Sequence, residues 1–179
     1  DALQALGIEL ACHEAASTEP AVRADLALSL VRAAGAEGMV LGQALDMAAE
    51  TAERQLTLDE ITALQSGKTG ALIVWAAEAG ARMAQADTTP LRRYAEALGL
   101  AFQIADDILD VEGDAAEVGK AVRKDAEAGK ATFVSLLGLD EAKRRADTLV
   151  TQACDALSSY GDEAETLKQA ARFVIARRN

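Results

Sequence analysis

The stretch Phe102–Asp110 constrains this chain most, because one glutamine and three acidic residues interrupt an otherwise apolar segment. Residues three and four apart share one face of an α-helix. Gln103, Asp106 and Asp110 therefore line one side of the predicted helix, and Asp107 is turned about 100° away. Carboxylates are rarely buried without a partner, so this face requires either a cation or contact with solvent.

The clustered oxygens on this face predict a site for a hard cation such as Mg²⁺. In proteins Mg²⁺ usually keeps several waters and takes one or two carboxylates together with substrate phosphates. The alternative is a solvated acidic face, which the apolar neighbours Ile104, Ile108 and Leu109 disfavour because they leave little of the helix polar. Lysines elsewhere in the chain could each hold a phosphate oxygen as a point charge, although any one of them taken singly is more often an ordinary surface residue.

The composition favours helix over sheet. Hydrophobic residues make up 50% of the 179 residues and aromatic residues only 3%, and alanine and leucine are good helix formers. Pro20 and Pro90 stand where helices begin, and the segments Thr57–Glu60 and Asp162–Glu165 resemble capping boxes. We expect one all-α domain with a glycine-rich and charged loop over 112–131. The predicted helices lie near 1–16, 20–34, 38–52, 58–66, 68–86, 90–111, 139–159 and 163–177.

Charge and cysteine content exclude several classes of function. The formal net charge is −11, which argues against nucleic-acid binding because that requires a basic face. No apolar run approaches the roughly 20 residues that cross a bilayer, so stable membrane insertion is not expected. Cys12 and Cys154 form neither a metal-spaced pair nor a disulfide framework, which favours a cytoplasmic protein.

Five segments taken together resemble the trans-isoprenyl diphosphate synthase (polyprenyl synthetase) family, in particular its bacterial farnesyl, or geranyltranstransferase, type. The string Phe-Gln-x-x-Asp-Asp-x-x-Asp is specific and is similar to the family's second aspartate-rich motif, whereas the Gly-Lys pairs are weak alone. The segments are Gly42–Asp46, Lys68–Leu72, Phe102–Asp110, the run Gly119-Lys120 to Asp125 to Gly129-Lys130, and Arg177-Arg178-Asn179.

This resemblance implies a helical bundle of the isoprenoid synthase type, incomplete at its N-terminus, because the family's first aspartate-rich motif has no counterpart in the chain. Residues 1–179 are then expected to be the C-terminal part of a single synthase domain and to be inactive alone. The implied reaction condenses dimethylallyl or geranyl diphosphate with isopentenyl diphosphate to a short-chain product, farnesyl diphosphate, and releases diphosphate. The resemblance also implies Mg²⁺ as cofactor and a cytoplasmic homodimer.

The resemblance assigns roles to individual residues. Asp106 is the expected direct ligand of Mg²⁺, with Asp107 and Asp110 acting through metal-bound water. Thr69 and Gln103 are expected beside the allylic cation, which their oxygens would stabilise. The residues expected to hold the allylic diphosphate are Lys68, Lys120 and Lys130. The residues expected at the rest of the substrate are Gln43, Arg177 and Arg178, the two arginines closing over isopentenyl diphosphate.

Other interpretations of these residues stay open. Gln43 and Asp46 could serve a helix cap or an interhelical hydrogen bond. For Arg177 and Arg178 the favoured alternative is the positive charge that is routine at a helix C-terminus. At the level of the whole chain, a terpene cyclase of the same fold also uses a metal-diphosphate site, although Lys68 and the loop lysines argue against it. A non-catalytic helical subunit of a heteromeric prenyl synthase is favoured by the absent first motif and disfavoured by the intact second one.

Overall fold

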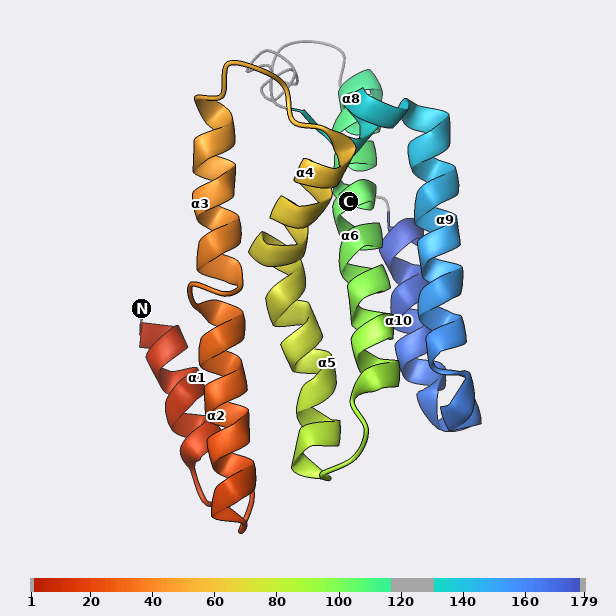
Figure 1. Cartoon of the computed structure of the whole chain (residues 1–179). Helices are drawn as coiled ribbons and strands as arrows, with labels where there is room; N and C mark the ends of the chain where they lie inside the picture. The colour runs from red at the N-terminus through yellow and green to blue at the C-terminus, as the bar shows by residue number, and fades with distance from the viewer. Residues whose placement is uncertain (1, 117–130, 178–179) are drawn as a thin grey trace.

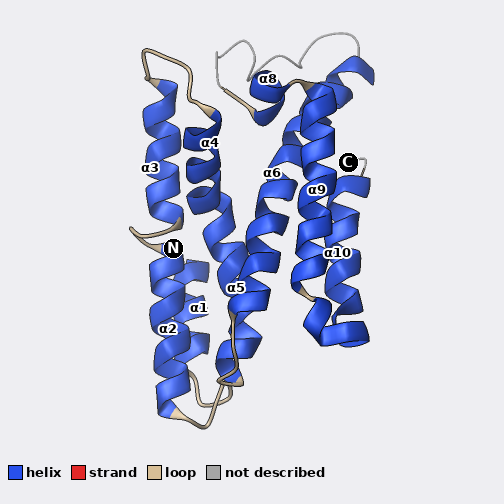
Figure 2. Cartoon of the chain, turned by 45° about the vertical axis from the view of Figure 1, so that its right-hand side comes forward, coloured by secondary structure: helices blue, strands red, loops and turns tan. Residues whose placement is uncertain are grey.

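Helices account for all the regular secondary structure in residues 2–116 and 131–177, which the computed structural model of the chain describes (Figures 1 and 2). This confirms the predicted all-α class. The elements are α1 (Ala2–Cys12), α2 (Pro20–Ala34), α3 (Met39–Glu50), α4 (Leu58–Gln65), η1 (Ser66–Gly70), α5 (Ala71–Met83), α6 (Thr89–Ala116), α8 (Phe133–Leu137), α9 (Leu139–Ala156), η2 (Ser158–Ala164) and α10 (Glu165–Ala176). None of these helices is long and apolar enough to cross a membrane.

Local start signals predicted two helices correctly and failed at a third. Pro20 is the first residue of α2, as expected. At α4 the Thr57 hydroxyl accepts from the Glu60 N–H (3.3 Å) and the Glu60 carboxylate accepts from the Thr57 N–H (2.8 Å), which is a reciprocal capping box. The box predicted at Asp162–Glu165 is wrong, because Asp162 lies within η2 and no side chain caps α10.

Two predicted helices are shorter than the sequence pattern indicated. The predicted helix 1–16 ends at Cys12, after which the chain turns. The predicted helix 68–86 is two elements, since Ser66–Gly70 forms the π-helical turn η1 and α5 follows it. A single turn of altered hydrogen bonding is too short to change a hydrophobic pattern, and such π-helical turns are frequent at functional sites.

The helix that carries the acidic stretch is longer than predicted, because α6 runs from Thr89 to Ala116. The start of the predicted loop 112–131 is therefore helical, and residues 117–130 lie outside the described part of the chain. The short helix α8 was not predicted. Its start is a capping box in which the Thr132 hydroxyl accepts from the Ser135 N–H (3.0 Å), with serine in place of the usual glutamate or glutamine.

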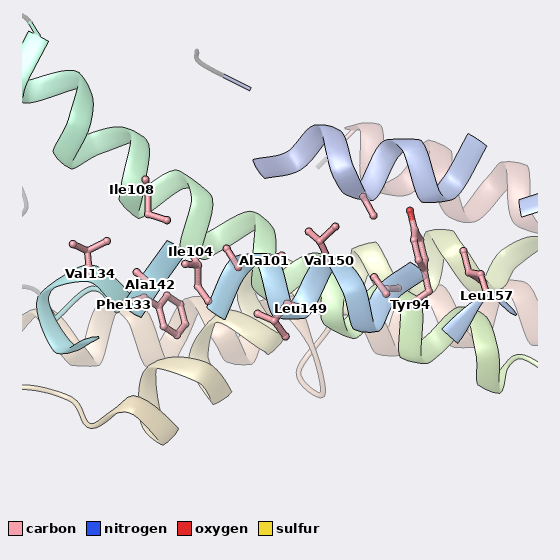
Figure 3. Close-up of a cluster of buried hydrophobic side chains, with 14 of the residues drawn as sticks. Tyr94, Ala101, Ile104, Ile108, Phe133, Val134, Ala142, Leu149, Val150 and Leu157 are labelled. Atoms are coloured by element: carbon pink, nitrogen blue, oxygen red, sulfur yellow. The ribbon is translucent and has the colours of Figure 1, made fainter. Parts of the chain in front are cut away.

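The main core lies between α6, α8, α9 and α10, and α6 packs most extensively against α9. Ile104, Phe133 and Leu157 are fully buried there, and Figure 3 shows Ile104 of α6 beside Phe133 of α8. Burying one such side chain contributes about 1.5–3 kcal/mol relative to leaving it exposed. The apolar face of α6 packs on this core. The acidic residues on the other side of α6 are therefore carried by a helix that is held in place.

A smaller core joins α1, α2 and α5. Leu26 and Leu30, one turn apart on α2, are buried against it, and Trp75 of α5 packs on it while its indole N–H donates to the Ser29 hydroxyl (3.0 Å). Figure 1 shows α3 continuing roughly in the direction of α2 beyond a break between Gly35 and Gly38, which the sequence also predicted. This continuation places α3 beside α4 and η1.

Candidate functional site

Glycine contacts bring three of the motif segments together around η1. A Cβ on Gly42 would lie only 2.0 Å from the backbone nitrogen of Lys68. Helix α3 and η1 can therefore approach this closely only because residue 42 is glycine. On its other side η1 packs on α6, where a Cβ on Gly99 would lie 3.5 Å from the Gly70 Cα. Gln103 is one helical turn beyond Gly99, and the acidic face of α6 continues from there.

Lys68 and Asp46 form an ion pair across this contact. Lys68 Nζ lies 2.8 Å from Asp46 Oδ2, and the two side chains are 33% and 13% exposed. The bond joins η1 to α3, so Asp46 makes the interhelical contact that the sequence left open as an alternative. Thr69 follows within the same π-helical turn and is partly buried. Lys68, the predicted phosphate ligand, is thus positioned by a carboxylate that uses one of the three donors of its ammonium group.

Asp106 is paired with Arg177, the residue that follows α10. The guanidinium forms an ion pair with the Asp106 carboxylate, donates to the Phe102 carbonyl (3.4 Å) and stacks 4.2 Å from the centroid of the Phe102 ring. A cation over an aromatic face is attracted by the ring quadrupole. The acidic face is therefore not simply solvated, because a protein cation already occupies it.

Asp107 points to a different element, as its rotation around the helix predicted. Its Oδ2 accepts a hydrogen bond from the Phe133 N–H (2.6 Å), the first residue of α8. This bond satisfies one of the backbone donors that a helix leaves free at its N-terminus, and it ties the start of α8 to α6. Asp110, one turn beyond Asp106, is exposed.

The residues on this face fit a magnesium ion that takes one or two protein carboxylates and completes its coordination with water or phosphate oxygens. No group of three or more acidic, histidine or cysteine side chains among the described residues is arranged to hold a metal. Asp106 offers a carboxylate that is 42% exposed, with the Arg177 guanidinium standing in for a cation. Mg²⁺ is typically bound by one or two carboxylates plus waters and phosphate oxygens, and Asp106 fits that requirement.

The remaining predicted residues have different outcomes. Gln43 is on α3 and exposed, and Gln103 is on α6 and partly buried. Lys120, Lys130 and Arg178 lie outside the described residues, so their predicted roles stay predictions.

A buried ionic cluster was missed by the sequence analysis. Glu78 is 1% exposed; its Oε2 lies 2.8 Å from Arg82 Nη2 and its Oε1 lies 2.7 Å from Arg92 Nε. Arg82 also reaches Asp25 at 2.9 Å. A lone glutamate in an apolar helix with an arginine four residues later is a signal that could have revealed it.

A cavity of about 1150 Å³ extends from this buried cluster to η1, where Ser66 and Gly70 line it together with Gly99 of α6. Its lining includes Glu78, Arg82 and Arg92, together with parts of α2 and α9, and it includes neither Lys68 nor Asp106. The cavity therefore borders the contact between η1 and α6 without reaching the two predicted ligands Lys68 and Asp106. A smaller cavity of about 520 Å³ between α6, α9 and α10 does reach Arg177.

Comparison with known proteins identifies the family. Residues 9–172 match the family model of polyprenyl synthetase. The chain is 37% identical over 192 residues to the farnesyl diphosphate synthase of Haemophilus influenzae, in an alignment that covers 100% of this chain and 61% of that enzyme. It is 46% identical over 129 residues to the farnesyl diphosphate synthase of Geobacillus stearothermophilus, covering 70% of this chain and 43% of that enzyme.

Solved structures agree. An FPP/GFPP synthase from Zymomonas mobilis superposes with a TM-score of 0.87 at 46% identity, covering 97% of this chain and 58% of that one. A geranyltransferase from Helicobacter pylori, solved with magnesium and isoprenyl diphosphate, gives a TM-score of 0.74 at 33% identity and covers 98% of this chain and 57% of that one. The chain thus spans between 43% and 61% of the length of these relatives. The family match and the shared helical fold confirm the resemblance drawn from the motifs, and the chain belongs to the polyprenyl synthetase family.

Proposed function

We propose that this chain carries the second aspartate-rich half of a Mg²⁺-dependent prenyltransferase site, as the C-terminal part of one synthase domain. The reaction joins an allylic diphosphate, dimethylallyl or geranyl, to isopentenyl diphosphate. The product is a short-chain isoprenyl diphosphate, and the relatives named farnesyl diphosphate synthase favour farnesyl diphosphate. The observation that carries the proposal is that η1, with Lys68 and Thr69, packs against both α3 and α6 at glycine contacts.

In this proposal each side chain handles a defined part of the reaction. The allylic C–O bond breaks, a C–C bond forms to isopentenyl diphosphate, and the departing diphosphate takes the proton that the new product loses. Lys68 holds a phosphate oxygen with a further donor of its ammonium group, which has three N–H bonds, while Asp46 positions the side chain. The oxygens of Thr69 and Gln103 stabilise the allylic cation electrostatically.

Asp106 would hold the magnesium ion, which fits the open carboxylate found there. When bound, Mg²⁺ neutralises charge on the departing diphosphate. Asp107 and Asp110 remain predicted partners of metal-bound water, and the bond from Asp107 to the α8 backbone adds a structural role for that carboxylate.

The test is binding of inorganic pyrophosphate in the presence of Mg²⁺, measured by calorimetry on the 179-residue chain. We expect Lys68→Met and Asp106→Asn each to weaken binding by about tenfold or more, the loss of one charge-assisted contact. Arg144→Met is the matched control, because Arg144 is an exposed cation paired with Glu141 on α9. Equal affinity for all the variants would contradict the proposal.

The chain alone is expected to show no turnover with geranyl diphosphate, labelled isopentenyl diphosphate and Mg²⁺, because only one of the family's two aspartate-rich motifs is present. Robust turnover would contradict that expectation. The homodimer and the cytoplasmic location implied by the resemblance also stay predictions, and light scattering after size exclusion would measure the first.

A non-catalytic subunit of a heteromeric synthase is the second candidate. It is favoured by the fact that Lys68 and Asp106 both already have ionic partners within the chain. A subunit of that kind would bind no pyrophosphate by itself, so the calorimetry distinguishes it from the first proposal.

A further inference from the structure

Arg177 stands where the proposed function needs a metal ion. Its guanidinium pairs with the carboxylate of Asp106, and the Arg177 side chain is 17% exposed whereas that of Asp106 is 42% exposed. The pair therefore joins a well-covered cation to a carboxylate that is open to solvent. We propose that Arg177 is the resident counter-ion of Asp106, positions its carboxylate, and has to be displaced when a divalent cation binds. This inference rests on the proposed function, because it concerns the same carboxylate.

Replacement of Arg177 by a divalent cation at Asp106 requires only that the Arg177 side chain moves. Without Asp106, the Arg177 guanidinium keeps its contact with the Phe102 ring at 4.2 Å and its hydrogen bond to the Phe102 carbonyl at 3.4 Å. The Arg177 backbone N–H donates to the Phe173 carbonyl (3.1 Å), so the last turn of α10 is held independently of the side chain. Displacement therefore need not unfold the end of α10.

The resting pair is also imperfect, which makes it replaceable. Arg177 Nε is buried without a hydrogen-bond partner in the described part of the chain, and an unmet buried donor is unfavourable. The strongest arginine–carboxylate pairs are bidentate and use parallel N–H groups, whereas here only Nη2 meets Asp106. A divalent cation carries twice the charge and brings its own waters, so it competes well for an open carboxylate.

The proposal predicts the sign of a coupling. If a cation must displace Arg177, then removing the guanidinium strengthens cation binding, and adding the cation must loosen Arg177 to the same degree, since binding couplings are reciprocal. A residue that only held the helix end in place would give the opposite sign or no effect. The two roles are therefore separated by direction and not by size.

The experiment measures Mn²⁺ binding to the 179-residue chain by electron paramagnetic resonance of the free ion. Arg177→Met keeps a long apolar stem over Phe102 and removes the charge; it is expected to bind Mn²⁺ about tenfold more tightly, the factor set by one charge-assisted contact. Asp106→Asn is expected to lose this binding. Arg172→Met is the matched control, because Arg172 lies on α10, the helix just before Arg177, and pairs with Glu165 at 2.9 Å.

A second readout uses the unaltered chain and therefore does not depend on how a variant folds. The NMR signal of the Arg177 Nε–H, assigned by its loss in Arg177→Lys, should shift on titration with Mg²⁺ and stay constant in Asp106→Asn. Arg177→Lys keeps a positive charge near Asp106, so it should gain less in Mn²⁺ affinity than Arg177→Met.

The outcomes separate the inference from the proposed function. Unchanged or weaker Mn²⁺ binding by a folded Arg177→Met chain, with Asp106→Asn still abolishing the site, would overturn the role of Arg177 and leave the metal site standing. An Arg177 Nε–H signal that does not shift at saturating Mg²⁺ would also overturn the role of Arg177. Absence of Mn²⁺ binding in the original chain and all its variants would overturn both.

Discussion

The charged region around Glu78 and the charged region around η1 differ in how deeply the charges are buried and in how closely the backbones pack. Around Glu78 the carboxylate is buried and contacts two arginines, whereas the nearby Gly80 backbone has open space where a Cβ would go. Around η1 the backbones are so close that Gly42 admits no Cβ, yet Asp106 keeps almost half of its surface exposed. The region around Glu78 is held together by buried ion pairs, and the region around η1 is held together by close backbone packing.

This difference indicates where ligands can bind. A buried charge that loses a partner is strongly destabilising, so the Glu78 cluster is fixed by the fold. Ion pairs in which one side chain stays partly exposed, as in Lys68 (33%) and Asp106 (42%), are easier to separate than a fully buried pair, so their partners can be exchanged for ligand groups. A site needs both features, namely a rigid backbone that fixes geometry and charges that are free to change partner. The region at η1 and the acidic face of α6 has both.

The largest expected effect comes from breaking the buried cluster. We expect Glu78→Gln to lower the free energy of unfolding by about 3 kcal/mol, because two arginines lose their ionic partner. Urea denaturation followed by circular dichroism would measure this. Glu96→Gln on α6 is the control; Glu96 lines the same cavity but is exposed, and it should change stability by less than about 0.5 kcal/mol. Equal effects at the two positions would mean that burial does not distinguish this cluster.

A second prediction tests the close backbone packing at Gly42. Gly42→Ala places a Cβ 2.0 Å from the Lys68 nitrogen, and we expect a loss of about 1–3 kcal/mol from forcing α3 away from η1. Gly80→Ala is the matched control in α5, where nothing lies within 4 Å of the added Cβ. An alanine in that helix interior should stabilise by about 0.5–1 kcal/mol. Melting curves that move in the same direction for both variants would contradict the proposed contrast.

The sequence predicted the parts of the site that depend on helix periodicity. Gln103, Asp106 and Asp110 share a face because of their spacing, and Asp107 departs from it for the same reason. The partner of Asp106 could not be predicted, because Arg177 is 71 residues away and meets it only through the packing of α10 on α6. Lys68 and Asp46, 22 residues apart, are joined by the same kind of tertiary contact.

The fold was predictable to a similar extent. Proline positions and the Thr57 capping box set helix starts through local hydrogen bonding, and those predictions were confirmed. The π-helical turn at Ser66–Gly70, which contacts α3 and α6, was missed because one turn of altered hydrogen bonding leaves the hydrophobic pattern unchanged. Resemblance to a family supplied what local physics could not, namely which distant segments act together.

The smallest expected effect on stability is that of Glu60→Gln. Glu60 has as many bonding partners as Glu78 but is less buried, so it separates the effect of burial from the effect of the number of partners. Its carboxylate accepts from Arg54 at 2.6 Å and from the Thr57 N–H at 2.8 Å, so it is as well paired as Glu78, but its side chain is 40% exposed. The hydrogen bond from Arg54, followed by those from Thr57, lowers the pKa of Glu60 to about 2. If burial decides the outcome, Glu60→Gln will cost far less stability than Glu78→Gln.

The pH dependence of that difference follows from the direction of the shift. The pKa of Glu60 is lower in the folded chain than the usual value of about 4.3 in the unfolded one, so the unfolded state binds the proton more readily. The contribution of Glu60 is therefore fully present above about pH 5 and is lost as the pH falls toward 2. We expect the melting temperatures of the original chain and of Glu60→Gln to differ slightly at pH 7 and to converge near pH 2. Arg54→Met should raise the pKa of Glu60 toward its usual value, which NMR titration would detect. A constant difference across this range, or one as large as that of Glu78→Gln, would show that partner number outweighs burial in this protein.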